Sequence, residues 1–441
     1  MHSTFQRIVR AVVLPRMALP RPALFTRNSL VPRATQLTWN SVSAGAGSVA
    51  SGRLFSTGSG PAGQSGSSDR GSFSFGSFFS AVKKHFTKTD RSNSQTAQGT
   101  SHQEQKNDEM PKIDRSKFES ILADANKGDA SCQAVVGMCY KLGLYVKVDD
   151  TEGARWFRMA AEQNFAPAQL WLGICYAEGS GVPQDYKEAL KWYLRAAENG
   201  DADGAYNAGV LYSHGRGTEV NLAEAMKYFR MGAEAKHPES AVNLGKLFTS
   251  GTSACEVNHE EARKWFKLAA DQDYAPGQWN LALSYFGVGG APVDAAKAIE
   301  WLTKSAENGF PRAQFTLGAM YMQGAEGLPQ SRAKAMDYFK RGAESGDFDS
   351  LVSLGELYTD DFVKSDLSNM DASIDAVKYL NLANKVRPGQ PHVNALLGFH
   401  YSNSKDASTR QVGMKILTKE SQHYPLAAEF LKMVEQRATS Q

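Results

Sequence analysis

The feature that most constrains this chain is a glycine position that recurs every 36 or 37 residues. An aromatic residue follows each of these positions three residues later, and it is tyrosine in every case but Phe248. The glycine column comprises Gly137, Gly173, Gly209, Gly245, Gly318 and Gly355, with Ala282 taking its place once. A fixed period of this length predicts an array of stacked structural repeats rather than one compact core.

Two further columns keep the same period. The first is a column of alanines: Ala125, Ala161, Ala197, Ala233, Ala270, Ala306 and Ala343. The second is a column of apolar pairs: Trp156-Phe157, Trp192-Tyr193, Tyr228-Phe229, Trp265-Phe266, Trp301-Leu302 and Tyr338-Phe339. We expect the glycine column to allow close approach of a neighbouring helix, and a Tyr or Trp ring to fill the groove between adjacent units.

Each unit is predicted to contain two antiparallel helices, helix A and helix B. In the second unit, helix A runs from about Pro167 to Glu178 and stops at Gly179, which gives the backbone freedom for a turn. Helix B begins at Asp185, and Glu188 completes a capping-box pattern three residues later. The same pattern recurs one and two periods on, at Asn221 with Glu224 and at Asn258 with Glu261.

Residues 166–197 carry the pattern A-x-A-Q-x-x-L-G-x-x-Y-x-x-G-x-G-V, followed by W-Y-x-x-A-A. This pattern resembles the Sel-one-like repeat family, which is similar to the tetratricopeptide repeats, and the resemblance covers about Ala125 to Ala343. It implies an all-α fold, a right-handed α-superhelical solenoid of about seven to eight two-helix repeats, whose helices A line a concave surface for partners. Departures from the pattern are an irregular loop at Ser250–Val257, an expected acidic loop at Thr359–Asp371 and a predicted capping helix at Pro425–Ala438.

The N-terminus has the composition of an organellar leader. Residues 1–68 contain no Asp or Glu but seven arginines, and Arg10 and Pro15 break the apolar run that a secretory signal needs. Arg53 to Thr57 resembles a mitochondrial processing site, so we predict a transit peptide over residues 1–57. The alternatives are a basic leader without a targeting role and a plastid address. Twin-cysteine patterns are absent from the sequence, which favours the mitochondrial matrix over the intermembrane space.

Residues 58–111 are rich in Gly and Ser and are predicted to form a flexible linker, so the solenoid is assigned to residues 112–441. One apolar island interrupts the linker: Phe78, Phe79, Val82 and Phe86, beside Lys83 and Lys84. Its spacing fits a short amphipathic helix for docking or for peripheral contact with a membrane. An apolar cluster within a linker is the alternative that we favour from sequence. No apolar run is long enough to span a membrane.

The sequence carries no recognisable catalytic, metal or cofactor motif. Gly58–Gly63 spells G-x-G-x-x-G, but it lies in the linker with no predicted strand before it, so we assign no dinucleotide site. Cys139 and Cys175 share one repeat position and are expected to be buried small hydrophobes. Without the seven leader arginines the formal charge changes from +3 to −4, so no nucleic-acid partner is expected.

We therefore predict a non-catalytic mitochondrial scaffold or adaptor that binds a protein or peptide in its concave groove, for complex assembly or quality control. An adaptor of endoplasmic-reticulum protein degradation or signalling is the alternative. A lesser one is an unrecognised hydrolase of the Cys-rich repeat type, although this chain lacks two cysteines per repeat. The candidate groove residues are Trp171, Tyr206, Asn207, His214, Asn243, Trp279, Asn280 and Phe315. For the asparagines the alternative is hydrogen bonding between neighbouring helices, and for His214 it is a solvated turn residue.

Overall fold

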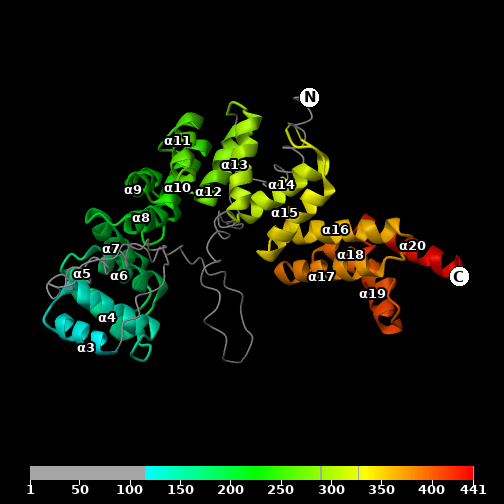
Figure 1. Ribbon diagram of the computed structural model, residues 1–441. Coiled ribbons are helices and arrows are strands. Elements are labelled where there is room, and N and C mark those ends of the chain that lie inside the picture. Colours follow the sequence, from blue (N-terminus) through cyan, green and yellow to red (C-terminus); the bar gives the residue numbers. More distant parts are fainter. Residues whose placement is uncertain (1–114, 289–290, 326, 441) are drawn as a thin grey trace, which may run out of the picture. The chain divides into compact units, whose positions relative to one another are not determined.

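The computed structural model describes residues 115–288, 291–325 and 327–440, and this part of the chain is helical (Figure 1). The predicted transit peptide and the predicted linker lie outside the described residues. Within that part, the extended structure is limited to two isolated bridges, Thr252 with Cys255 and Ala325 with Leu328. The all-α fold class is therefore confirmed.

The helices divide into two compact units after Gln272. The first unit contains α3 (Arg115–Asn126), α4 (Ala130–Leu142), α5 (Asp150–Glu162), α6 (Ala166–Glu178), α7 (Tyr186–Glu198), α8 (Ala202–His214), α9 (Leu222–Glu234), α10 (Pro238–Ser250) and α11 (His259–Ala270). The second unit contains α12 (Ala275–Tyr285), α13 (Ala295–Glu307), α14 (Pro311–Gln323), α15 (Arg332–Glu344), α16 (Phe348–Lys364), α17 (Met370–Val386), α18 (Pro391–Ser402), α19 (Ala407–Glu420) and α20 (Pro425–Ser440).

Within each unit, consecutive helices pack against one another as hairpins of helix A and helix B. The first unit stacks α4/α5, α6/α7, α8/α9 and α10/α11 after α3. The second unit stacks α12/α13, α14/α15, α16/α17 and α18/α19, and α20 packs on both helices of the last hairpin. These eight hairpins agree with the predicted number of repeats.

Side-chain caps start the B helices where the sequence places them. The carboxylate of Asp185 accepts the backbone N–H groups of Lys187 and Glu188 at 2.8 and 3.1 Å. The amide oxygens of Asn221 and Asn258 likewise accept the N–H group three residues on, at 3.0 Å each. Each bond satisfies a donor that would otherwise lack an intrahelical partner. The capping positions predicted from the repeat period are thus confirmed.

The glycine column lies against the second member of the apolar pair, on helix B of the same hairpin. A methyl group added to Gly173 would lie 2.6 Å from the ring of Tyr193, and one added to Gly318 would lie 2.7 Å from Phe339. The equivalent pairs are Gly137 with Phe157, Gly209 with Phe229 and Gly245 with Phe266, while Leu380 replaces the ring at Gly355. The ring therefore fills space inside one hairpin at the glycine, which the expectation of a groove between adjacent units did not include. Phe157 also stacks on Trp171 of the next hairpin, with ring centroids 5.9 Å apart.

The turn between helix A and helix B contacts the preceding hairpin through a second glycine. Gly181 has φ of +74°, and a methyl group there would overlap the backbone carbonyl of Asp150 on α5. Gly217 meets the backbone of Tyr186 on α7 in the same way. Since a side chain would clash with main-chain atoms that cannot rotate away, glycine is required at these contacts.

Buried glutamines join neighbouring hairpins through the alanine column. The side-chain nitrogens of Gln133, Gln169 and Gln314 donate to the carbonyls of Ala125, Ala161 and Ala306 at 3.1, 3.2 and 3.0 Å. The side-chain oxygens of Gln133, Gln169 and Gln278 accept from Gln163, Asn199 and Asn308 at 2.8, 2.8 and 3.0 Å. The side-chain oxygen of Gln314 is buried without a partner, because Ser345 occupies the position that corresponds to Asn308. We call this repeated set of glutamine hydrogen bonds the glutamine ladder, and at Gln314 the bond to the side-chain oxygen is missing.

The predicted acidic loop at Thr359–Asp371 is mostly helical, and that expectation was wrong. Helix α16 continues to Lys364, and the connection to α17 is confined to residues 365–369. The hydroxyl of Thr359 donates to the carbonyl of Gly355 at 2.7 Å, so it is already part of the helix. By contrast, the predicted capping helix is confirmed as α20, where Phe430 stacks on Phe399 with ring centroids 4.4 Å apart.

Candidate partner-binding surface

The candidate residues all lie on A helices, but they belong to both units. The first unit carries Trp171 on α6, Tyr206, Asn207 and His214 on α8, and Asn243 on α10. The second unit carries Trp279 and Asn280 on α12 and Phe315 on α14.

The large apolar rings among these candidates are buried. Trp171 is 6% exposed and stacks on Phe157 with centroids 5.9 Å apart. Trp279 is 5% exposed and lies 5.7 Å from the ring of Phe310, and Phe315 is 8% exposed. Their contacts hold the hairpins together, so little of each ring is accessible to a partner in this conformation.

The asparagines at these positions are half-buried. The side-chain nitrogen of Asn207 donates to the carbonyl of Asp203 at 2.9 Å, and that of Asn280 donates to the carbonyl of Pro276 at 2.7 Å. Both carbonyls lie four residues earlier in the same helix. These two bonds are therefore local, and they do not join neighbouring helices as the sequence-based alternative proposed. Asn243 is likewise half-buried, on α10.

His214 is exposed at the end of α8. Its Nδ1 atom lies 2.9 Å from the carbonyl of Val210 and 3.0 Å from the hydroxyl of Ser213. Gly215 follows in the left-handed conformation and ends the helix. The imidazole thus caps the carbonyl end of α8, which agrees with the alternative of a solvated turn residue.

A buried acid–histidine pair lies beside Tyr206 and Asn207, and the sequence analysis missed it. His237 caps α10 by accepting the N–H group of Ser240 on Nδ1 at 3.2 Å. Its Nε2–H group therefore donates to the Oδ1 atom of Asp203 on α8, 3.0 Å away. The His237 and Tyr206 ring centroids are 4.9 Å apart. Two of the predicted surface residues are thereby brought together with a polar pair that joins α8 to α10.

Asp201 adds a second carboxyl group at the N-terminus of α8. It caps the helix by accepting the N–H group of Gly204 at 2.7 Å, and burial raises its pKa to about 6. The repeat period did contain a signal for the acid–histidine pair. Asp201 caps helix A of the third repeat, and His237 takes the same capping position one period later. The signal was missed because histidine is not among the preferred capping residues.

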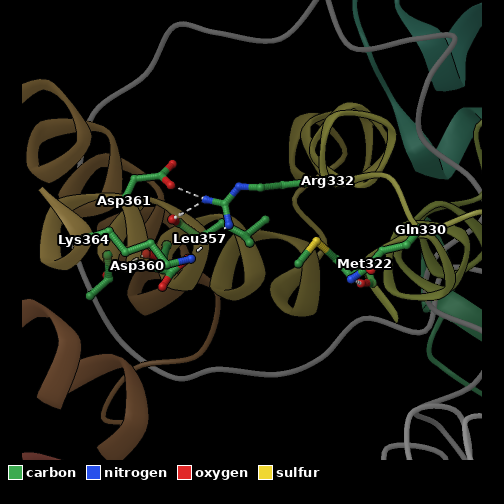
Figure 2. A network of polar contacts seen from close by, with 9 residues as sticks. Met322, Gln330, Arg332, Leu357, Asp360, Asp361 and Lys364 are labelled. Atoms are coloured by element: carbon green, nitrogen blue, oxygen red, sulfur yellow. Dashed lines mark hydrogen bonds and ion pairs between the residues drawn. The ribbon is translucent and has the colours of Figure 1, made fainter. Parts of the chain in front are cut away.

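In the second unit, the longer α16 helix is joined to α15 by an arginine. Figure 2 shows Arg332 reaching from the start of α15 toward the carboxylates of Asp360 and Asp361. Its guanidinium also donates to the carbonyl of Leu357 at 2.9 Å, and Lys364 pairs with Asp360 at 2.8 Å. These aspartates lie in the segment that the sequence analysis assigned to a loop, so the network was not foreseen.

The described residues were compared with the expected absence of a metal site and with the expected burial of the cysteines. They contain no group of three or more His, Cys, Asp or Glu side chains arranged to hold a metal ion. Cys139 and Cys175 are buried, as expected, and burial raises their pKa values to about 11 and 12, so both thiols stay protonated near neutral pH. None of the described helices is long and apolar enough to cross a membrane.

Comparisons with known proteins agree with the repeat architecture. The model of the family described as Sel1 repeat matches six consecutive segments: residues 130–165, 166–201, 202–237, 238–274, 275–310 and 311–347. A protective antigen of uropathogenic Escherichia coli strains that displays an SLR fold is 25% identical, with a TM-score of 0.52 over 73% of this chain and 75% of that one. A Sel1 repeat protein from Oxalobacter formigenes is 28% identical, with a TM-score of 0.47 over 52% of this chain and 92% of that one. Among curated proteins none matches this chain.

Proposed function

Because the chain belongs to the Sel1 repeat family, we propose that it is a non-catalytic mitochondrial scaffold or adaptor that holds a protein or peptide partner on its A helices. Stacked hairpins present the same helix position at regular intervals along an extended surface, so such arrays are suited to binding extended partners. The process served is the assembly or the quality control of an organellar protein complex.

The observation that carries the binding proposal is the group of Tyr206, Asn207, Asp203 and His237 at the N-terminal ends of α8 and α10. An asparagine whose nitrogen bonds its own helix can still accept a hydrogen bond from a partner backbone through its amide oxygen. A half-buried tyrosine supplies apolar contact at a low cost in side-chain entropy. Asn243 and Asn280 repeat the same helix position in the first and the second unit.

The mitochondrial part of the proposal is supported by residues 1–68, with seven arginines and no acidic residue. Proximity labelling by the intact protein in cells, with mass spectrometry of the labelled proteins, tests it. We expect mitochondrial neighbours and a mature N-terminus between Phe55 and Gly58. Neighbours drawn only from the endoplasmic reticulum would support the degradation adaptor instead and overturn the proposal.

The binding surface of the first unit is tested by the double substitution Asn207→Ala and Asn243→Ala, on α8 and α10. Two lost amide contacts, at about 1 kcal/mol each, should lower affinity for a recovered partner about 10- to 30-fold. Gln411→Ala, which removes an exposed amide on α19, is the matched control and should leave recovery unchanged. Circular dichroism and thermal unfolding accompany the test. Loss of helicity together with loss of the partner would show that these asparagines are structural.

A further inference from the structure

Three hairpins each hold a pair of stacked tyrosine rings. One ring of each pair belongs to the tyrosine column of helix A, and the other directly precedes the helix B residue that faces the glycine column. The pairs are Tyr212 with Tyr228, Tyr321 with Tyr338, and Tyr358 with Tyr379. Their ring centroids are 5.8, 5.9 and 5.8 Å apart, and their planes are 8°, 7° and 3° from parallel. The repeat therefore builds one geometry three times.

In each pair the two rings are in contact, and at least one of them is within reach of solvent. Parallel rings at this centroid separation form an offset stack, in which the edge of one ring lies over the edge of the other. Ring carbons in such a contact are about 3.5–4.0 Å apart. Tyr228 and Tyr321 are only 8% and 9% exposed. Their partners Tyr212 and Tyr338 are half-buried, and so are both rings of the third pair, so an oxidant in solvent can take an electron from each pair.

We propose that these three pairs are sites of oxidative cross-linking, at which a one-electron oxidant of the carbonate-radical class joins the two rings as dityrosine. Two carbonate radicals take one electron and one proton from each phenol and become two bicarbonate ions. The two phenoxyl radicals then form a carbon–carbon bond between the ring carbons ortho to their oxygens, because the side chain blocks the para position. Each bonded carbon passes its hydrogen to the oxygen of its own ring as a proton, through water, which restores both phenols. The inference does not depend on the proposed function.

Other hairpins of the same chain lack the second phenol. A tryptophan takes the helix B position in the hairpins of Tyr140, Tyr176 and Tyr285, at Trp156, Trp192 and Trp301. These hairpins hold no tyrosine pair at the two positions, so dityrosine should be confined to the three stacks. A covalent link between helix A and helix B would restrain the unfolded hairpin as a disulfide does.

Radiolysis of the full chain tests the proposal. Bicarbonate buffer saturated with nitrous oxide yields carbonate radicals in a known dose, and two radicals per chain suffice for one cross-link. We expect dityrosine fluorescence and three pairs of cross-linked tryptic peptides, because Lys and Arg residues place the two tyrosines of each stack on separate peptides. Tyr228→Phe keeps the ring but removes the phenol, so it should abolish the cross-link to Tyr212 and leave the other two cross-links unchanged.

Two further variants make the test specific. Tyr212→Phe removes the phenol from the other helix of the same stack and should abolish the same cross-link. Tyr176→Phe is the matched control, since Tyr176 takes the same helix A position in a hairpin that carries Trp192, and it should leave all three cross-links. Circular dichroism verifies that each variant keeps its helices. Absence of dityrosine, or dityrosine that mainly joins different hairpins or two copies of the chain, would overturn the proposal.

Discussion

Gly318 and Phe339 are in direct contact, so the changes in the free energy of unfolding caused by substitutions at the two positions should not be additive. A methyl group on Gly318 would lie 2.7 and 2.8 Å from two ring atoms of Phe339, against an ordinary separation of 3.5–4.0 Å. Phe339 is only 3% exposed, so its ring cannot move into solvent. Overpacking of this kind costs about 1–3 kcal/mol, and the higher helix propensity of alanine returns about 1 kcal/mol. Gly318→Ala should therefore destabilise the second unit by about 1 kcal/mol.

The double-mutant cycle isolates the contact. Phe339→Leu alone should cost about 1–2 kcal/mol, because it removes buried ring atoms and leaves a cavity. In the double variant the new methyl group fills part of that cavity, so the loss should be about 1–2 kcal/mol smaller than the sum of the single losses. The fifth repeat carries this combination naturally, since Ala282 takes the glycine position and Leu302, fully buried, takes the ring position.

Native-state hydrogen exchange of amides in α14 and α15 is the assay, because it reports the free energy of opening in the second unit alone. The reciprocal cycle, Ala282→Gly with Leu302→Phe, is the control and should show coupling of the same sign. Losses that add within about 0.3 kcal/mol in both cycles would refute the steric account of the glycine column.

Two further changes probe buried polar groups of the second unit. Ser345→Asn should supply the missing donor to the side-chain oxygen of Gln314 and raise the free energy of unfolding by about 1 kcal/mol; no gain in denaturant midpoint would contradict the ladder. His400 is held neutral between Thr359 and Ser373, at 2.8 Å from each hydroxyl, and burial lowers its pKa from 6.5 to about 4. The unfolded chain takes up this proton at a higher pH than the folded chain, so stability should fall by about 3 kcal/mol as pH drops from 6.5 to 4. His400→Gln, followed by urea unfolding across this range, should flatten the pH dependence; an unchanged slope would assign it to other groups.

The sequence predicted well those features that depend on residues close together in the chain. The cap at Asp185, the stop at Gly179 and the number of hairpins were all predicted correctly. Each reflects local backbone hydrogen bonding or repetition at a fixed period. The chemistry of a partner site is not periodic in this way, so the candidate residues on helix A were chosen by position alone.

The sequence by itself thus determined that this protein is an all-α array of two-helix repeats, since only stacking can bury the apolar stripe of each hairpin. The tertiary structure decided which member of each apolar pair faces the glycine, that Trp171 and Trp279 are buried, and that His237 meets Asp203. These contacts join residues about 14 to 34 positions apart. They depend on the direction in which each side chain leaves its helix, and the spacing of residue types along the sequence does not give that direction.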